Sequence, residues 1–313
     1  MTSKIEALLL SVVLMAAASL AACSSSPRRG LIEKARTEGW RILVQSDGEL
    51  YFLDLESSSI IPIGLEPDGD HSHRTGSFDP AGTRVAYTHR GNSVGIFDPA
   101  TRKAETLLTM PYICDARWSP NGKDIALQGR SASTGNYDLY VYRLSDHQPT
   151  LIVAKELNPG YGGVSWAPDG KSIVYEDSQF NLWIINPDTK ERRKLDTGTS
   201  PTWSPSGQYV AYQVVDKNAK NPGFVIYDLQ SQKKQRILAG QDILSGLIWS
   251  PDSRYLIFSR LSRGLLATWV ALHGDDYWGD LYVLDLTSGA ESRVYRQGGT
   301  IVPVDWAKTK VQH

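Results

Sequence analysis

Cysteine is scarce in this sequence, because 313 residues include only Cys23 and Cys114. Two cysteines exclude a disulfide scaffold, and neither belongs to the CxxC pairs on which cysteine-based zinc sites are built. Excess positive charge is also absent, since 33 Lys and Arg stand against 34 Asp and Glu. The chain therefore has no basic stripe of the kind that nucleic-acid-binding domains carry, and we expect no nucleic-acid partner.

The common catalytic and nucleotide-binding motifs are missing as well. The sequence contains no GxSxG, HExxH, Walker A or GxGxxG pattern, so it implies no cofactor. It is instead rich in aromatic and turn-forming residues, with 15 Tyr, nine Trp, 27 Gly and 16 Pro. This composition favours many short strands joined by many turns.

The first 22 residues have the features of a secretory signal peptide. An apolar run over residues 7–22 follows Lys4, and it is too short and too rich in Ala and Ser for a good membrane span, which needs about 20 strongly apolar residues. The run ends in Leu-Ala-Ala before Cys23, which resembles the lipobox of bacterial lipoproteins. A plain signal peptide and a buried N-terminal helix are the alternatives.

The lipoprotein resemblance implies that Cys23 receives a diacylglycerol, that the chain is cut before it, and that the new amino group is acylated. Acyl chains of this kind hold a protein stably on a bilayer. Ser24, rather than Asp, follows the cysteine, which implies an outer-membrane anchor facing the periplasm. We expect residues 23–39 to hold the lipidated cysteine and a tether, with residues 24–30 flexible.

Two motifs recur six times each between residues 40 and 308. The first motif is an aromatic residue followed by a Pro-Gly turn, which predicts a strand, a tight turn and a second strand. The second motif is a short apolar strand that usually ends in Asp, and its copies are spaced by 42–45 residues except for the last pair, which are 57 apart. The copies of the first motif are FDPAG at 78–82, WSPNG at 118–122, WAPDG at 166–170, WSPSG at 203–207, WSPDS at 249–253 and a truncated WAK at 306–308. The copies of the second motif are YFLD at 51–54, GIFD at 95–98, YVYR at 140–143, WIIN at 183–186, VIYD at 225–228 and YVLD at 282–285.

A four-stranded unit repeated every 40–50 residues is typical of a β-propeller. The order of the motifs also indicates a circular permutation. The first copy of the second motif, at 51–54, precedes the first copy of the first motif, at 78–82, and no copy of the second motif follows the last copy of the first motif, at 306–308. A strand near residues 302–306 must therefore join strands from residues 41–65. We predict an all-β, six-bladed propeller of four-stranded antiparallel blades over residues 40–308, closed by this C-terminal strand, with residues 309–313 as a tail.

The W-S-P-D-G, I-A-Y and L-Y-V-x-D elements of these repeats resemble the TolB-type propeller repeat, also called PD40 or WD40-like. The resemblance covers nearly all of the chain after Cys23 and implies a fold rather than a function. TolB proteins carry an α/β domain ahead of the propeller, for which the segment between Cys23 and Trp40 is too short. We interpret the repeated Trp118, Trp166 and Trp203, together with Trp249, as core residues wedged between blades and not as ligand platforms.

The connections at one end of the propeller vary in length, which marks that end as the expected binding face. The variable segments are residues 128–136, 213–223 and 260–279. The last is an aromatic insert that predicts a partner contact, with a lid packed on its own blade as the alternative. Its candidate contact residues are Trp269, His273, Asp275, Asp276, Tyr277 and Trp278.

A second candidate group lies at the expected mouth of the central channel. His71, His73 and Arg74 precede the second repeat, and Tyr112 and Asp115 precede the third. Alternate residues of an extended segment point the same way, so His71 and His73 could share a metal ion, although hydrogen-bonded loop histidines are the alternative. Asp68 or Asp70 could add an oxygen ligand, and a third ligand would come from His89, His273 or Asp115.

These observations favour an envelope lipoprotein whose propeller is a non-catalytic binding scaffold. Its partner would be another envelope protein, a cell-wall component or a glycan, and its membrane contact would be the lipid anchor. One alternative is a metal-dependent enzyme acting on a saccharide or peptide at the channel mouth, because some propellers related by the resemblance are metal-dependent sugar lyases. Another alternative is a structural spacer without a ligand.

Overall fold

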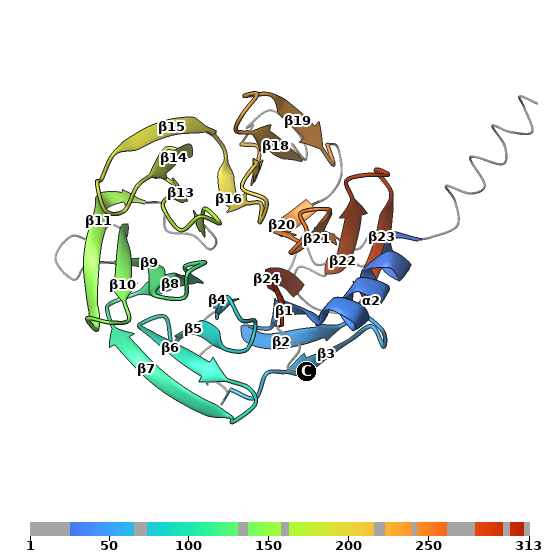
Figure 1. Ribbon diagram of the computed structural model, residues 1–313, viewed down its shortest axis with the longest axis horizontal. Coiled ribbons are helices and arrows are strands. Elements are labelled where there is room, and N and C mark those ends of the chain that lie inside the picture. The colour runs from blue at the N-terminus through green and yellow to red at the C-terminus, as the bar shows by residue number, and fades with distance from the viewer. Residues whose placement is uncertain are drawn as a thin grey trace, which may run out of the picture.

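The computed structural model describes residues 26–65, 74–130, 137–157, 163–215, 223–239, 243–261, 279–296 and 301–309. These residues form six four-stranded antiparallel sheets arranged as blades around a ring (Figure 1), which confirms the predicted fold. The predicted signal peptide and Cys23 lie outside the described residues.

Each blade runs from a first strand beside the centre of the ring to a fourth strand at the rim. Blade 1 contains, from the centre outward, β24 (Ile301–Lys308), β1 (Trp40–Ser46), β2 (Glu49–Asp54) and β3 (Ser59–Pro62). Blade 2 contains β4 (Gly76–Phe78), β5 (Val85–His89), β6 (Ser93–Asp98) and β7 (Lys103–Thr109). Blade 3 contains β8 (Ile113–Trp118), β9 (Asp124–Arg130), β10 (Tyr137–Arg143) and β11 (Gln148–Leu157). Blade 4 contains β12 (Val164–Trp166), β13 (Ile173–Glu176), β14 (Asn181–Ile185) and β15 (Arg192–Thr197). Blade 5 contains β16 (Thr199–Trp203), β17 (Tyr209–Gln213), β18 (Phe224–Asp228) and β19 (Lys234–Ile237). Blade 6 contains β20 (Ile243–Trp249), β21 (Tyr255–Leu261), β22 (Gly279–Asp285) and β23 (Glu291–Arg296).

The repeated Pro-Gly motif forms the turn between the first and second strand of a blade. In blade 3 the Gly122 amide donates to the carbonyl of Ser119 at 2.9 Å, and the Ser119 hydroxyl accepts from the Asp124 amide at 2.9 Å. Gly122 has φ of 72°, which glycine adopts without strain. Blade 6 has Ser253 at the equivalent position, with φ of 59°. The turn therefore has the same geometry in blade 6 even without glycine.

The ring closes by pairing the two ends of the propeller sequence, as the motif order predicts. β1 pairs antiparallel with β24, and Ile42 lies opposite Trp306. Trp40 packs edge-on against Trp306, with ring centroids 5.4 Å apart and planes at 86°. Closure by strand pairing leaves no unpaired edge at the junction between the two chain ends.

A helix precedes the first strand, so the prediction of a flexible tether over residues 24–30 is wrong from Pro27 onward. Helix α2 (Pro27–Glu38) begins with a proline, which suits the first helical turn, and ends at Gly39 with φ of 66°. Leu31 is fully buried, and Ile32 and Ala35 pack against the same core cluster. This apolar face is what orders the segment, because it packs against β1, β22 and β23.

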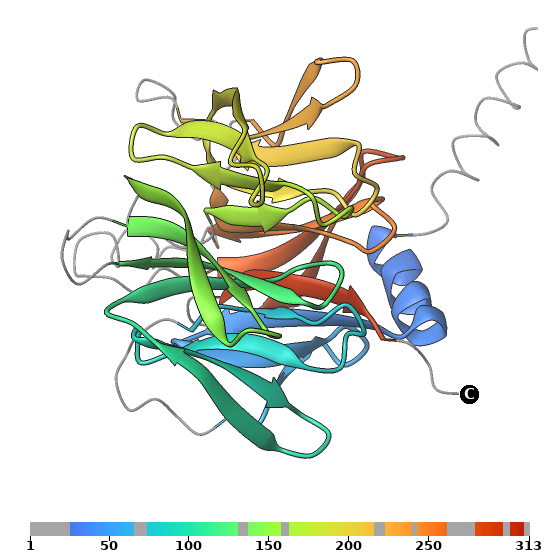
Figure 2. The same cartoon turned by 60° about the vertical axis from the view of Figure 1, so that its left-hand side comes forward.

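The two ends of the propeller differ. The turns after the first strand of blades 2 to 6 and after the third strand of every blade emerge together at one end, which we name the turn end, and the other connections emerge at the loop end. Helix α2 lies at the turn end, across the ends of the sheets (Figures 1 and 2). The three variable connections predicted to mark a binding face belong to the loop end, and most of their residues lie outside the described ranges. Within those ranges no helix is both long and apolar enough to cross a membrane.

Candidate functional site

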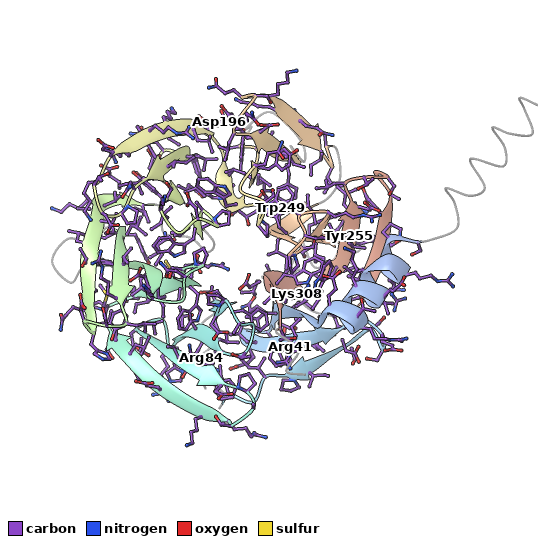
Figure 3. The ribbon with its side chains drawn as sticks, viewed as in Figure 1. Arg41, Arg84, Asp196, Trp249, Tyr255 and Lys308 are labelled. Carbon is purple, nitrogen blue, oxygen red and sulfur yellow. The ribbon has the colours of Figure 1, made fainter. Side chains whose placement is uncertain are left out.

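A central cavity of about 730 Å³ follows the axis of the ring. Its wall is built from the first strands, which contact one another around the centre, and from the turns that follow them. Side chains from every blade converge on it (Figure 3), with Trp249 close to the centre and Asp196 far out at the rim. A volume of a few hundred to a thousand Å³ is typical of ligand-binding pockets.

The repeated motif supplies most of the apolar wall. Trp118, Trp166 and Trp249 are more than nine-tenths buried, as the core interpretation predicts, and yet their exposed edges face the cavity. Trp203 differs, because it is only half-buried and its indole Nε1 donates to Gly207 of its own turn at 3.3 Å. The lining from this motif comprises Trp118, Trp166, Trp203, Trp249, Trp306, Pro80, Pro120, Pro168, Pro205 and Pro251.

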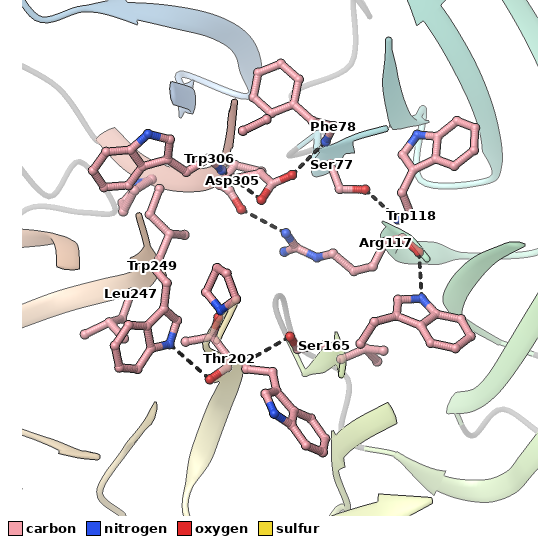
Figure 4. A pocket seen from close by; sticks show the side chains of 18 of the residues that line it. Ser77, Phe78, Arg117, Trp118, Ser165, Thr202, Leu247, Trp249, Asp305 and Trp306 are labelled. Atoms are coloured by element: carbon pink, nitrogen blue, oxygen red, sulfur yellow. Dashed lines mark hydrogen bonds between the residues drawn. The ribbon is translucent and has the colours of Figure 1, made fainter. Parts of the chain in front are cut away.

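Two of these tryptophans are hydrogen-bonded to the preceding blade (Figure 4). Trp166 Nε1 donates to the carbonyl of Arg117 at 3.1 Å, and Trp249 Nε1 donates to the carbonyl of Thr202 at 3.3 Å. A buried indole held by both packing and a hydrogen bond loses little further freedom when a ligand binds against it. This part of the wall is therefore organised before any ligand arrives.

In three blades the side chain of the residue before the repeated aromatic forms a second link between blades. The Ser77 hydroxyl accepts from the Trp118 amide at 2.7 Å, and the Ser165 hydroxyl accepts from the Trp203 amide at 3.0 Å. In blade 1 the Asp305 carboxylate takes the same role, accepting from the Phe78 amide at 2.7 Å. In blades 1, 2 and 4 a short oxygen-bearing side chain at this position therefore joins one first strand to the backbone of another.

Blade 3 has Arg117 at that position, and its guanidinium projects across the wall toward blade 1 (Figure 4). Nη1 donates to the carbonyls of Val304 at 2.8 Å and Gly76 at 3.3 Å. Nε lies 2.9 Å from a carboxylate oxygen of the fully buried Asp115. Burial disfavours the charge of Arg117, but the carboxylates of Asp115 and Asp305 hold its pKa above the usual value.

Burial also raises the pKa of Asp305, although Arg117 and the amides of Phe78 and Trp306 oppose that shift. The cluster of Arg117, Asp115 and Asp305 thus places one fixed cation in the cavity wall and surrounds it with compensating acceptors. Since its members come from β8 and β24 and its bonds reach β4, it also ties three blades together.

Arg74, predicted as a binding residue, does line the cavity, but it is 1% exposed. Its Nη1 lies 2.8 Å from a carboxylate oxygen of Glu49, and its Nη2 lies 3.3 Å from Nδ1 of His89. His89, one of the residues considered as a third metal ligand, therefore contacts Arg74. The structure places Arg74 as an ion-paired part of the wall.

The other described candidates do not line the cavity. Tyr112 is 57% exposed at the surface, and the Arg130 guanidinium lies 5.2 Å from its ring centre. Asp115 is buried behind Arg117. Cys114 is half-buried, with Sγ 3.5 Å from the carbonyl of Gln128, as expected of a structural thiol.

The remaining candidate residues lie outside the described part of the chain. They are His71, His73, Trp269, His273, Asp275, Asp276, Tyr277 and Trp278. Among the described residues, no group of three His, Cys, Asp or Glu side chains is arranged to hold a metal ion.

Sequence reasoning missed Arg117, Asp305 and the proline lining. A signal was present, because the residue before the repeated aromatic is Ser77, Ser165 or Thr202 in three blades but carries a charge at Arg117 and Asp305. Opposite charges at a repeated position that otherwise carries small hydroxyl or apolar side chains indicate an electrostatic attraction between blades.

Comparison with known proteins supports the TolB-like propeller and nothing narrower. No protein-family model matches the chain. An uncharacterized protein of Agrobacterium fabrum is 28% identical over 194 residues, which is 57% of this chain and 61% of that protein. The Tol-Pal system protein TolB of Anaeromyxobacter dehalogenans is 29% identical over 134 residues, covering 39% of this chain and 29% of TolB. The alignments thus span less than two thirds of these relatives.

Solved structures give the same result. TolB from Acinetobacter baumannii superimposes with a TM-score of 0.71 and 16% identity over 89% of this chain and 70% of that chain. An oligogalacturonate lyase in complex with manganese superimposes with a TM-score of 0.56 and 18% identity over 79% of this chain and 70% of the lyase. At these identities the likeness concerns the fold alone, and the chain folds as a TolB-like six-bladed β-propeller.

Proposed function

We propose that this protein is an envelope lipoprotein, anchored through Cys23, whose propeller is a non-catalytic scaffold for a partner or ligand. The observation that carries the proposal is the central cavity, with its apolar Trp and Pro wall and the fixed cation of Arg117. Such a wall suits a partner that offers apolar groups and a few hydrogen-bond acceptors. The partner would be an envelope protein, a cell-wall component or a glycan.

Two further features support this proposal. The sequence that precedes Cys23 resembles a lipobox, and the propeller resembles TolB, a protein of the Tol-Pal system. The links between first strands make the cavity rigid, and a pre-organised wall lowers the entropic cost of binding. In this proposal the insert at residues 260–279, together with residues 71–73 and the exposed Tyr112, forms the outer part of the site, and Arg74 belongs to the wall of the cavity.

Site-specific photo-crosslinking in the native envelope tests the scaffold. A photoreactive residue at Thr202, which lines the cavity, is expected to give a discrete adduct with one partner. The same residue at Thr150, exposed on the outer strand β11, serves as the matched control and is expected to give none. Equal adducts from both positions, or none from Thr202, would contradict a cavity-centred binding site.

The second candidate function is a metal-dependent enzyme acting on a saccharide or peptide. It is supported by the likeness to a manganese-containing oligogalacturonate lyase and by the spacing of His71 and His73. Metal content measured on purified protein separates the two proposals. A stoichiometric metal ion that is lost in the double variant His71→Ala/His73→Ala would favour the enzyme, and equal metal content in both proteins would remove its main support.

A further inference from the structure

We infer that helix α2 fixes the orientation of the propeller on the membrane, with the turn end against the lipid surface and the loop end pointing away from it. The inference rests on the proposed anchoring through Cys23. It goes further by assigning the surface that meets the lipid and the face that stays accessible to a partner.

The first observation is that α2 is bound to the turn end of two blades. Lys34 donates a hydrogen bond to Asp252 in the turn between β20 and β21 of blade 6. Arg28 Nη2 donates to the carbonyl of Leu55 at 3.4 Å and to the Ser58 hydroxyl, both in the turn between β2 and β3 of blade 1. The helix therefore spans the junction at which the ring closes.

The second observation is that α2 is part of the folded body. Leu31 is fully buried in a cluster with Trp40, Tyr255 and Trp306, which belong to blades 1 and 6. Figure 3 shows Tyr255 beside the helix. A helix held by a buried leucine and by polar bonds at both ends cannot swing as a tether would.

The third observation is the short distance from the helix to the anchor. Only Ser24 and Ser25 separate Cys23 from Ser26, whose hydroxyl lies 3.2 Å from that of Ser292 in β23. Three residue steps span at most about 10 Å. The lipid would thus attach within about 10 Å of the turn-end rim of blade 6.

The height of a blade makes this distance decisive. β21 has seven residues, and a strand rises about 3.3 Å per residue, so the loop end lies roughly 20 Å farther along the axis than the turn end. A tether of about 10 Å keeps the lipid surface next to the turn-end rim of blade 6, roughly 20 Å from the loop end. In this orientation the loop end is directed away from the membrane, and the turn-end side of the cavity, lined by Pro120, Pro168 and Pro205, faces it.

Fluorescence quenching in vesicles tests the orientation. The acylated protein carrying Cys114→Ser is reconstituted into vesicles whose lipid headgroups bear a nitroxide quencher. Single probes are attached at Thr287→Cys, exposed in the turn between β22 and β23, or at Arg296→Cys, exposed at the loop end of β23 in the same blade. We expect quenching at position 287 to exceed quenching at position 296 by at least twofold.

A linker variant provides the matched control. Ten Gly and Ser residues inserted between Ser26 and Pro27 leave the helix docked but lengthen the tether, so the difference between the two probes is expected to disappear. Equal quenching at both positions in protein that carries the acyl mass on Cys23, or stronger quenching at 296, would overturn the orientation alone. Absence of the acyl mass would overturn the anchoring as well, so the two failures are distinguishable.

Discussion

Lys34 of helix α2 donates a hydrogen bond to the carboxylate of Asp252, which lies 218 residues later in the chain. The bond joins the segment before the first strand to the last blade, beside the closure made by β1 and β24. Burial alone would raise the pKa of Asp252, but hydrogen bonds from Lys34 and Ser250 lower it below the usual value of 3.8. The same bond raises the pKa of Lys34.

This pair predicts a pH-dependent contribution to stability. Because the pKa of Asp252 is lower in the folded than in the unfolded state, its contribution is present above pH 3.8 and is lost as the pH falls through the lowered value. The measurement is the free energy of unfolding of the wild type and of Asp252→Asn between about pH 6 and pH 2. We expect the difference between the two proteins to shrink as the solution becomes more acidic, and a difference that stays constant would refute the role of the pair.

Leu31 is predicted to hold the helix to the propeller. Replacing this fully buried side chain by Ala is expected to lower the free energy of unfolding by about 2–5 kcal/mol, the usual range for a buried leucine. Glu33→Ala is the control, because Glu33 is exposed on the same helix and its loss is expected to cost less than about 0.5 kcal/mol. Equal effects of the two substitutions would show that α2 does not depend on its apolar face.

Arg117→Met is predicted to destabilise the ring by about 3–5 kcal/mol, because it leaves Asp115 and Asp305 buried without their cation. Urea unfolding of the single and double variants checks this. Adding Asp305→Asn should recover part of the loss, since one of the two uncompensated carboxylates is then removed. Strictly additive effects would mean that Arg117 and Asp305 do not interact.

The insert is predicted to be dispensable for folding. β21 and β22 pair directly, with Leu261 opposite Gly279, so a short Asn-Gly turn in place of residues 262–277 should join them. We expect an unchanged circular dichroism spectrum and a thermal midpoint within a few degrees of the wild type, together with a weaker crosslink from Thr202. A large fall in the thermal midpoint would identify the insert as part of the core.

The fold was more predictable from sequence than the site. The spacing of Trp118, Trp166 and Trp249 follows the blade repeat, because each ring fills the same gap between sheets, and that periodicity was enough to predict six blades and their closure. Helix α2 was not predicted, since its polar composition masks the small apolar face of Leu31, Ile32 and Ala35. The electrostatic attraction between Arg117 and Asp305 acts between blades 3 and 1, which are far apart in the sequence, so local periodicity does not encode it.

The anchor is the premise shared by the proposed function and by the orientation, and the intact mass of the protein extracted from native membranes tests it most directly. The account predicts a chain that begins at Cys23 and carries the added mass of a diacylglycerol and an amide-linked acyl chain, and a Cys23→Ala variant that lacks both and appears in the soluble fraction. A membrane-extracted chain without acyl mass at Cys23, or persistent fatty-acid labelling of Cys23→Ala, would contradict the account.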